Sequence, residues 1–399
     1  MQLLRVRVPN FRALKDVDLT FEKDFVPQIF PLGSLNGGGK STLLQLIFIL
    51  LHSSYTKQAA EIEAYLRNIL DYVALDENGY GEIATLDIRN GEQVVEITFF
   101  CKNIKAICSE LNIRILDQDT MRDYLEQNNV WYVAPRDYRY VPDPNNIFFS
   151  DMNRKLLFCR SPYGTDATPK LFSDFLIKLT SRVFLAAPSS QIYLFLPPEE
   201  RKSLFKVDGS YNNALEKAKK SLPGFFTYDT SSVAEIVKFF RIARDMDFDE
   251  KVKTGHYGNH YDRMLRDINQ AIAGGKKIIP QLSELSQKIH EPDKDLIDSI
   301  IFKANDGTEI YPEDLSHGEL KKLSIYAWLK ANQIKDSIVL MDEIENGFHP
   351  DWQFQIVQEL EAWEPSNQYI LATHSYGLCT ALTPSHVKEL EPELLSTPK

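Results

Sequence analysis

The chain has 399 residues, of which 43% are apolar and 25% charged, with a formal net charge of −11 at pH 7. This composition is that of an ordinary globular protein, and the length allows two or three domains. The negative charge argues against nucleic-acid binding over the whole surface, although it leaves a local basic groove open. The four cysteines form no C-x-x-C pair, which argues against a zinc knuckle or a disulfide framework.

The N-terminus carries no signal-peptide pattern. The longest apolar run, 43–51, is too short to cross a membrane and contains Gln45, so it is better explained as a buried helix. We therefore expect a cytoplasmic protein with no membrane partner.

The first part of the chain predicts mainly strands. An Asn90-Gly91 turn between two β-rich runs predicts a hairpin. A glycine-rich loop after the third strand leads into an apolar helix that starts near Thr42. Short runs of strand character occur at 3–8, 17–21, 28–32, 83–88, 94–100 and 131–134.

The middle of the chain, 137–294, predicts a mostly helical insertion. Helical patterns alternate there with loops rich in Pro, Tyr and Asp, at 171–184, 212–221, 232–246 and 261–273. Two short strands, 300–302 and 309–311, should follow. The last hundred residues read as helix, strand, helix, strand, which predicts a parallel sheet covered by helices.

The loop from Gly33 to Thr42 predicts phosphate binding. Glycines let backbone N–H groups converge on phosphate oxygens, and the N-terminus of the following helix adds positive charge. Lys40 would reach the β- and γ-phosphates, and the Ser41 hydroxyl would coordinate Mg²⁺. Ser34 stands where the first glycine of this motif is usual. A glycine-rich turn is the alternative, but the strand before and the helix after favour a phosphate loop. The expected ligands of the nucleotide are Asn36, Gly37, Gly38, Gly39, Lys40, Ser41 and Thr42.

An apolar run at 338–341 ends in Asp342 and Glu343. Ligands of open α/β sheets bind outside the carboxyl ends of the strands, where these side chains should lie. Asp342 is placed to hold Mg²⁺, and Glu343 would orient and deprotonate the attacking water. A solvated acidic turn is the alternative, which the phosphate loop upstream makes less attractive.

Ser316 and Glu319 have the spacing of a capping box, which by itself predicts only a helix start. In the functional interpretation, the N-terminus of this helix and the Gly318 amide face the γ-phosphate held by a second subunit. A further apolar run, 369–372, ends near His374, which could hydrogen-bond the γ-phosphate. A structural histidine is the alternative at this position.

Together these segments resemble the motifs of ABC-type ATPases. Gly-Lys-Ser-Thr at 39–42 resembles a Walker A motif, Leu-Ser-His-Gly-Glu at 315–319 a signature, Asp-Glu at 342–343 a Walker B motif, and His374 a switch histidine. Two stretches are similar to the SMC/RecF and OLD-like branch, which includes defence-associated, Septu-like ATPases: Asn-Phe-Arg at 10–12 and the run 342–350. His317 departs from the usual signature glycine, and no clear Q-loop glutamine is present.

The resemblance implies an α/β fold: an ABC-ATPase head, with a parallel-core sheet flanked by helices and N-terminal antiparallel β hairpins, plus the helical insertion. Residues 1–136 would be the head lobe with Walker A, and 295–399 the lobe with the signature, Walker B and switch histidine. It also implies that Arg12 touches the phosphates, that Arg136 stands in for the Q-loop glutamine, and that Ser316, Gly318 and Glu319 complete a neighbour's site.

The implied function is an ATP- and Mg²⁺-dependent ATPase that forms a dimer or higher oligomer. The leading hypothesis is a switch that controls a separate nuclease or effector protein in anti-phage defence. Two alternatives stay open: a DNA repair or recombination ATPase that acts directly on DNA, and a scaffold stabilised by ATP with little turnover.

Two features of the insertion are weaker signals. His256 and His260 could suggest a metal site, but Gly255 and Gly258 spoil the helix that would align them, and no further ligands cluster nearby. The run 136–140 interleaves bases with aromatic residues, as single-strand binders do, although a packed loop explains it as well.

Overall fold

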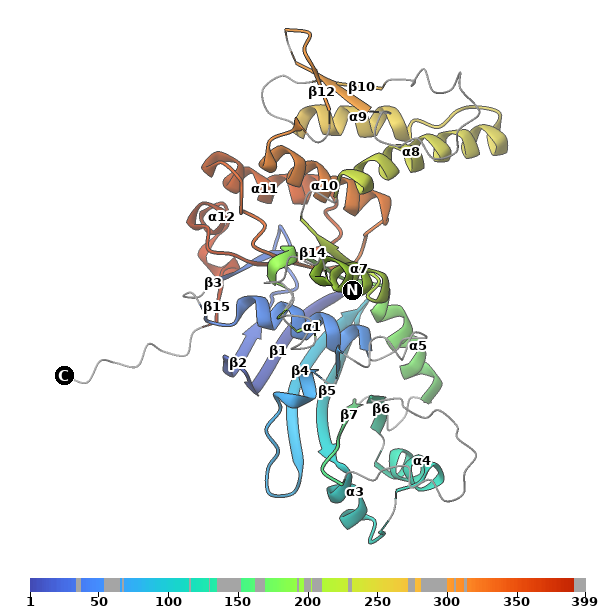
Figure 1. The fold of residues 1–399 in the computed structure, drawn as a ribbon, viewed down its shortest axis with the longest axis vertical. Helices are drawn as coiled ribbons and strands as arrows, with labels where there is room; N and C mark the ends of the chain where they lie inside the picture. The colour runs from blue at the N-terminus through green and yellow to red at the C-terminus, as the bar shows by residue number, and fades with distance from the viewer. Residues whose placement is uncertain are drawn as a thin grey trace, which may run out of the picture.

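The computed structural model describes residues 1–33, 37–53, 65–66, 68–114, 116–128, 130–134, 152–161, 169–191, 194–196, 202, 210–228, 232–271, 277–280, 300–304, 306–311 and 314–390. These residues form two six-stranded sheets and one three-stranded sheet, with helices packed around them (Figure 1).

The central sheet is parallel and has the strand order β15-β3-β14-β13-β8-β9. Its strands are β3 (Ile29–Gly33), β8 (Val183–Ala187), β9 (Phe225–Thr227), β13 (Ile338–Asp342), β14 (Gln368–Ala372) and β15 (Lys388–Glu389). Strands β13 and β14 are buried along their whole length, as expected for central parallel strands covered on both faces.

Alternate residues of β13 enter two different cores. Ile338 and Leu340 join the cluster that contains the apolar face of α1 (Lys40–Ser53), which packs against β8, β13 and β14. Val339 and Met341 join the cluster on the opposite face, which contains α10 (His317–Ala331) and α11 (Pro350–Trp363). The sheet therefore separates a helix that begins at the glycine-rich loop from the two helices that flank the acidic strand.

The second sheet is antiparallel, with the order β2-β1-β4-β5-β7-β6. Its strands are β1 (Gln2–Phe11), β2 (Leu14–Thr20), β4 (Tyr80–Asn90), β5 (Gln93–Asn103), β6 (Val130–Ala134) and β7 (Lys155–Arg160). The predicted hairpin is confirmed: Asn90 pairs with Gln93, and Gly91 supplies the positive φ of +65° that the tight turn needs.

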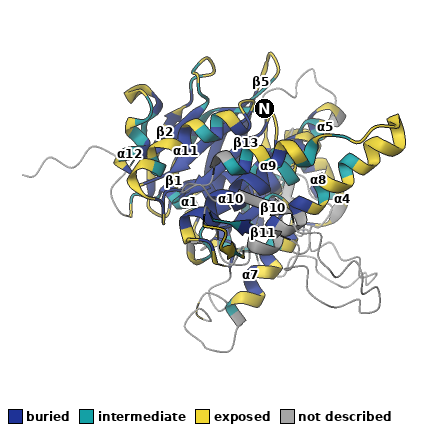
Figure 2. Cartoon of the chain, turned by 90° about the horizontal axis from the view of Figure 1, so that it is seen from above, coloured by how far each residue is buried: buried dark blue, intermediate teal, exposed yellow. Residues whose placement is uncertain are grey.

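Two groups of helices lie at opposite ends of the molecule (Figure 1). Beside the antiparallel sheet, α3 (Ile104–Glu110) and α4 (Gln118–Asn128) cover a small separate core. At the other end, α8 (Ser232–Thr254) and α9 (His260–Ala271) pack together near the third sheet, β10 (Lys277–Pro280), β11 (Ile300–Lys303) and β12 (Glu309–Ile310). The outer part of α8 is exposed, including Phe248 and Val252 (Figure 2). Other helices in the described part of the chain include α5 (Pro169–Thr180), α7 (Ser210–Ser221) and α12 (Tyr376–Thr380).

The predicted fold class, a parallel-core α/β head with N-terminal antiparallel hairpins, is confirmed by the two large sheets. The expectation for 137–294 was incomplete, because that range supplies β7 to the antiparallel sheet and β8 and β9 to the central one. The helix predicted over 171–184 ends at Thr180: Val183 and Leu185 pair with β13 and are fully buried. The division of the chain at residues 136 and 294 stays a prediction.

No helix in the ranges described above is both long enough and apolar enough to span a membrane.

Candidate nucleotide site

The glycine-rich loop joins β3 to the N-terminus of α1. Gly37 and Gly39 have φ angles of +84° and +92°, in the left-handed region that glycine reaches without strain. Lys40, the first residue of α1, is buried, while Ser41 and Thr42 are half-buried. Gly37 is exposed and Gly38 is half-exposed, so the two residues are accessible to solvent next to the helix N-terminus. Ser34 and Asn36 lie outside the described residues.

The turn between β1 and β2 packs against this loop. A Cβ atom on Gly39 would lie 2.6 Å from Cδ2 of Leu14, a separation that real Cβ atoms do not adopt. Two residues earlier, Arg12 is exposed, has a φ angle of +54°, and places its guanidinium carbon 4.7 Å from the centre of the Tyr72 ring. Arg12 therefore lies on the segment that packs on the phosphate loop, and its contact with phosphates stays a prediction.

Ser41 and Asp342 meet across the sheet edge. The Ser41 hydroxyl donates a hydrogen bond of 3.0 Å to Oδ1 of Asp342, although the two residues come from opposite ends of the chain. Asp342 is only 1% exposed, and its Oδ2 has no hydrogen-bond partner among the described residues. Burial raises the pKa of Asp342 to about 7, against the lowering effect of the Ser41 hydrogen bond.

The Ser41 hydroxyl and the buried Asp342 carboxylate fit the binding of a Mg²⁺ ion. A buried carboxylate oxygen without a partner has lost its hydration, and a cation nearby would restore the charged form. A hydroxyl and a carboxylate are the oxygen donors that Mg²⁺ prefers, with waters and phosphate oxygens completing its shell. Ser41 and Asp342 could therefore hold the ion as the sequence predicts.

Glu343 follows the acidic strand and is half-buried. Its backbone has a φ angle of +49°, and its N–H donates to the carbonyl of Ala372 at 2.9 Å. Asp342 pairs with Ala372 in the parallel register, so the carboxyl ends of β13 and β14 coincide. The side-chain amide of Asn346 donates a hydrogen bond to the Glu343 carboxylate. This contact directs the carboxylate of Glu343, the predicted base, toward the turn that contains Asn346.

His374 lies just beyond β14, with an exposed ring. Its backbone N–H donates a 2.7 Å hydrogen bond to Oε1 of Glu345, which is only 5% exposed. His374 and Glu343 thus follow neighbouring strands at one edge of the sheet, as predicted. The anchoring by Glu345 was not predicted, although its position in the acidic run after β13 was a signal that could have been followed.

Lys321 is a second residue that the sequence analysis missed. It lies on α10, is 4% exposed, and its Nζ donates to the carbonyls of Glu343 at 2.8 Å and Asn346 at 3.2 Å. Burial lowers the pKa of Lys321 to about 8, while the carboxylates of Glu345, Glu343 and Asp342 act in the opposite direction. Lys321 therefore bonds α10 to the turn that carries Glu343, the predicted base.

The capping box at the start of α10 is confirmed. The Glu319 N–H donates to Ser316 Oγ at 3.4 Å, and the Ser316 N–H donates to Glu319 Oε2 at 3.0 Å. Ser316 is exposed, whereas Gly318 is buried, and a Cβ on Gly318 would lie 2.8 Å from the Gly347 carbonyl. Within this chain Gly318 therefore allows α10 to approach the 343–349 turn. A part for Ser316, Gly318 and Glu319 in a neighbour's site stays a prediction.

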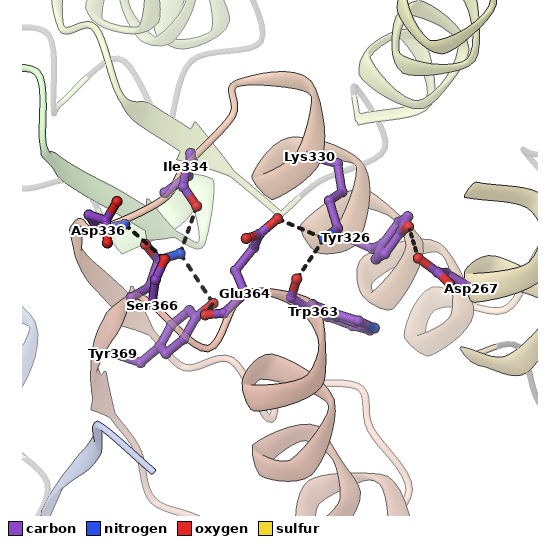
Figure 3. A network of polar contacts seen from close by, with 10 residues as sticks. Asp267, Tyr326, Lys330, Ile334, Asp336, Trp363, Glu364, Ser366 and Tyr369 are labelled. Atoms are coloured by element: carbon purple, nitrogen blue, oxygen red, sulfur yellow. Dashed lines mark hydrogen bonds and ion pairs between the residues drawn. The ribbon is translucent and has the colours of Figure 1, made fainter. Parts of the chain in front are cut away.

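A polar network connects the far end of α10 to its surroundings (Figure 3). Lys330 Nζ donates to the Trp363 carbonyl and to Glu364 Oε1, both at 2.6 Å. Tyr326 donates from its hydroxyl to Asp267 Oδ2 of α9 at 2.7 Å. Helix α10 is thus bonded to α9 as well as to the end of α11.

The described structure gives no support to the metal site that His256 and His260 could suggest. His256 is exposed, and His260 starts α9, 3.6 Å from Glu250. Within the described ranges, no group of three or more His, Cys, Asp or Glu side chains could hold a metal ion. The run 136–140, with Arg136, lies outside those ranges.

Comparison with known families gives one match to part of the chain. A family model described as "AAA domain, putative AbiEii toxin, Type IV TA system" matches residues 199–380. This range contains the start of α10, the acidic strand end and His374, but not the phosphate loop.

A curated relative, the "Retron Vc95 probable ATPase" of Vibrio cholerae serotype O1 biovar El Tor, is 33% identical over 148 residues. The match covers 34% of this chain and spans only 28% of the relative's own length.

Two solved structures are distantly similar. The Smc head domain with an extended coiled coil, bound to the C-terminal domain of ScpA and derived from Pyrococcus furiosus, is 14% identical with a TM-score of 0.45, covering 95% of this chain and 91% of that one. The SMC head domain from Thermotoga maritima is 11% identical with a TM-score of 0.43, covering 96% and 92%. The family match and the retron relative confirm the predicted resemblance to ABC-type P-loop ATPases of the defence-associated kind.

Proposed function

We propose that this protein binds MgATP between α1 and the carboxyl ends of β13 and β14, and hydrolyses it to ADP and phosphate. The observation that carries the proposal is the 3.0 Å contact between Ser41 and Asp342. It brings a glycine-rich helix start and a buried acidic strand end to one point, as the binding of a nucleotide with its metal ion requires.

Each predicted residue then has a distinct role. The N-terminus of α1 and Lys40 bind the phosphates, since both present positive charge at the mouth of the loop. Ser41 and Asp342 would hold Mg²⁺, which when bound neutralises charge on the phosphate oxygens. Glu343 accepts a proton from the attacking water, after its carboxylate leaves the Asn346 amide. His374 donates a hydrogen bond to the γ-phosphate.

We further propose that the protein works in the cytoplasm as a dimer or higher oligomer that controls a separate nuclease or effector in anti-phage defence. The exposed Ser316 at the start of α10 supports a site shared between two copies, because a helix N-terminus attracts an anion. The names of the matched family and relative, a type IV toxin–antitoxin system and a retron, support the defence role.

The test is a comparison of Glu343→Gln with Lys40→Ala. The Gln side chain keeps the shape of Glu343 but removes its basicity, so ATP should still bind while phosphate release falls roughly a hundredfold or more. ATP should then accumulate in a closed assembly, detected by light scattering. Lys40→Ala should lose ATP binding, as measured by calorimetry, and with it both phosphate release and the ATP-dependent assembly. Unchanged phosphate release in Glu343→Gln would remove the assigned role of Glu343, and an ATP-bound assembly that is the same in Glu343→Gln as in the natural chain would favour a scaffold.

A further inference from the structure

The turn that follows β13 holds Glu345 in one orientation. Glu343 at its start and Gly347 near its end both have positive φ angles, +49° and +84°. Backbone hydrogen bonds close the turn from Asn346 N to the Glu343 carbonyl at 3.2 Å and from Phe348 N to the Glu345 carbonyl at 2.9 Å. Lys321 binds two carbonyls of the same turn. The Glu345 side chain therefore projects from a backbone fixed at several points.

The side chain of Glu345 reaches the segment that carries His374. Its Oε1 accepts the His374 N–H at 2.7 Å, while its Oε2 is buried with no hydrogen-bond partner among the described residues. A hydrogen bond in a buried site of low dielectric constant is stronger than one exposed to water, so it restrains the backbone that donates it. This hydrogen bond links the turn after β13 directly to His374.

The neighbouring residues fix the rest of the segment but not His374. β14 holds the chain as far as Ala372. Ser375 donates from its N–H to Thr373 Oγ1 at 2.9 Å and from its hydroxyl to Gln353 Oε1 at 2.6 Å, and it caps α12 through the Leu378 N–H. His374 is exposed, so the backbone sets the point from which its side chain projects.

We propose that Glu345 is a positioning residue, which holds the backbone at His374 so that the imidazole points at the γ-phosphate while Glu343 activates water. This inference rests on the proposed function and adds to it a residue that acts through His374. In this role Glu345 needs a side chain long enough to accept the His374 N–H, and its negative charge is not required.

Two substitutions separate the effect of the Glu345 side-chain length from the effect of its charge. Glu345→Gln keeps the length and an acceptor oxygen but loses the charge. Glu345→Asp keeps the charge but is one methylene shorter, so it cannot hold the same N–H without a shift of the backbone. We expect Glu345→Asp to lower kcat by roughly tenfold to a hundredfold, with the KM for ATP changed less than about threefold, because a misplaced group costs rate and not binding. Glu345→Gln should stay within about threefold of the natural chain in kcat.

Combination with His374→Ala tests whether Glu345 acts through His374. Since residues that act as one unit are not additive, Glu345→Asp in the His374→Ala background should lower kcat by less than about twofold further. A full additional loss, or a larger loss for Gln than for Asp, would overturn the inference in favour of an electrostatic role.

Amide hydrogen exchange supplies a readout that does not depend on turnover. In Glu345→Asp the His374 N–H should exchange at least about tenfold faster, while the Ser375 N–H, held by Thr373, keeps its rate as an internal control. Glu345→Gln should leave both rates unchanged. If the natural chain hydrolyses no ATP, the proposed function fails, yet the exchange rates still decide whether Glu345 holds His374. Equal exchange at His374 in all three chains would overturn the inference.

Discussion

At the scale of single residues, the two positive-φ glycines of the phosphate loop meet different surroundings. A Cβ on Gly37 would have no heavy atom within 4 Å, whereas a Cβ on Gly39 would lie 2.6 Å from the Leu14 side chain. The backbone requirement is the same at both positions, but at Gly39 the missing side chain also allows the β1–β2 turn to pack on the loop.

This difference predicts unequal effects of Gly→Ala. Both substitutions place a Cβ in the left-handed region, which costs about 1–2 kcal/mol. Gly39→Ala must also displace Leu14, so it should lower the free energy of unfolding by about 1–3 kcal/mol more than Gly37→Ala. Denaturant unfolding of the two variants measures the difference. Equal losses would mean that the β1–β2 turn does not pack on the loop as described.

The sequence could predict the site residues that belong to recognisable spacings, but not the residues that support them. Lys40, Asp342, Glu343 and His374 lie where the motif pattern requires, at helix starts and strand ends. Nothing in the sequence marks Lys321, because its burial depends on how α10 packs on the 343–349 turn. Tyr228, whose ring lies 4.3 Å from Lys321 Nζ, comes from a distant segment with no motif.

At the scale of elements, α1 is attached to the central sheet at both ends. Ser41 binds Asp342, the last residue of β13, and His52 in the last turn binds the Val183 carbonyl of β8 at 2.8 Å. A carbonyl can only accept, so Nε2 carries the proton in this contact. Burial lowers the pKa of His52 to about 4, although the hydrogen bond to Val183 acts in the opposite direction.

The His52 contact predicts a pH-dependent stability. The folded pKa of about 4 lies below the ordinary value of 6.5, so the unfolded chain binds more protons between these values. This contribution to stability is complete above pH 6.5 and is lost as the pH falls toward 4. His52→Gln keeps a donor for the carbonyl but cannot titrate, so its thermal midpoint should fall less over this range. Parallel pH curves for the two chains would contradict the assignment.

Helices and strands were predicted correctly where the apolar periodicity of the sequence is clear. They were missed where pairing between distant segments determines the secondary structure. The β4–β5 hairpin, α10 and the last two buried strands follow from turn residues and apolar runs. The residues of β8 continue the apolar pattern of the preceding helix, so their pairing with β13 is invisible in the sequence. β9 has three residues, too few for a periodic signal.

At the scale of the whole molecule, α10 connects three regions. Its first turn is exposed at Ser316, its middle is bonded through Lys321 to the turn that carries Glu343, and its last turns are bonded to α9 and to the end of α11 (Figure 3). If a second copy binds its ATP against the start of α10, these contacts give a direct connection from that copy to the base of this one.

The central claim is tested most directly by mixing two inactive chains. Ser316→Arg should fill the space beside the helix N-terminus with a long side chain, and Lys40→Ala removes the phosphate-binding charge. Each chain alone should be inactive in ATP hydrolysis. Ser316→Ala removes the cap and the hydroxyl but adds no bulk, so as the matched control it should retain more activity than Ser316→Arg, at a stability cost of about 1 kcal/mol.

In a freely exchanging equal mixture of the Ser316→Arg and Lys40→Ala chains, half of the pairs combine the intact phosphate loop of one with the intact helix start of the other. Activity should therefore return to about a quarter of that of the natural chain. If every mixture stays inactive while both variants remain folded and exchange subunits, the ATP site is not shared between copies, and the account of a cooperative switch is wrong.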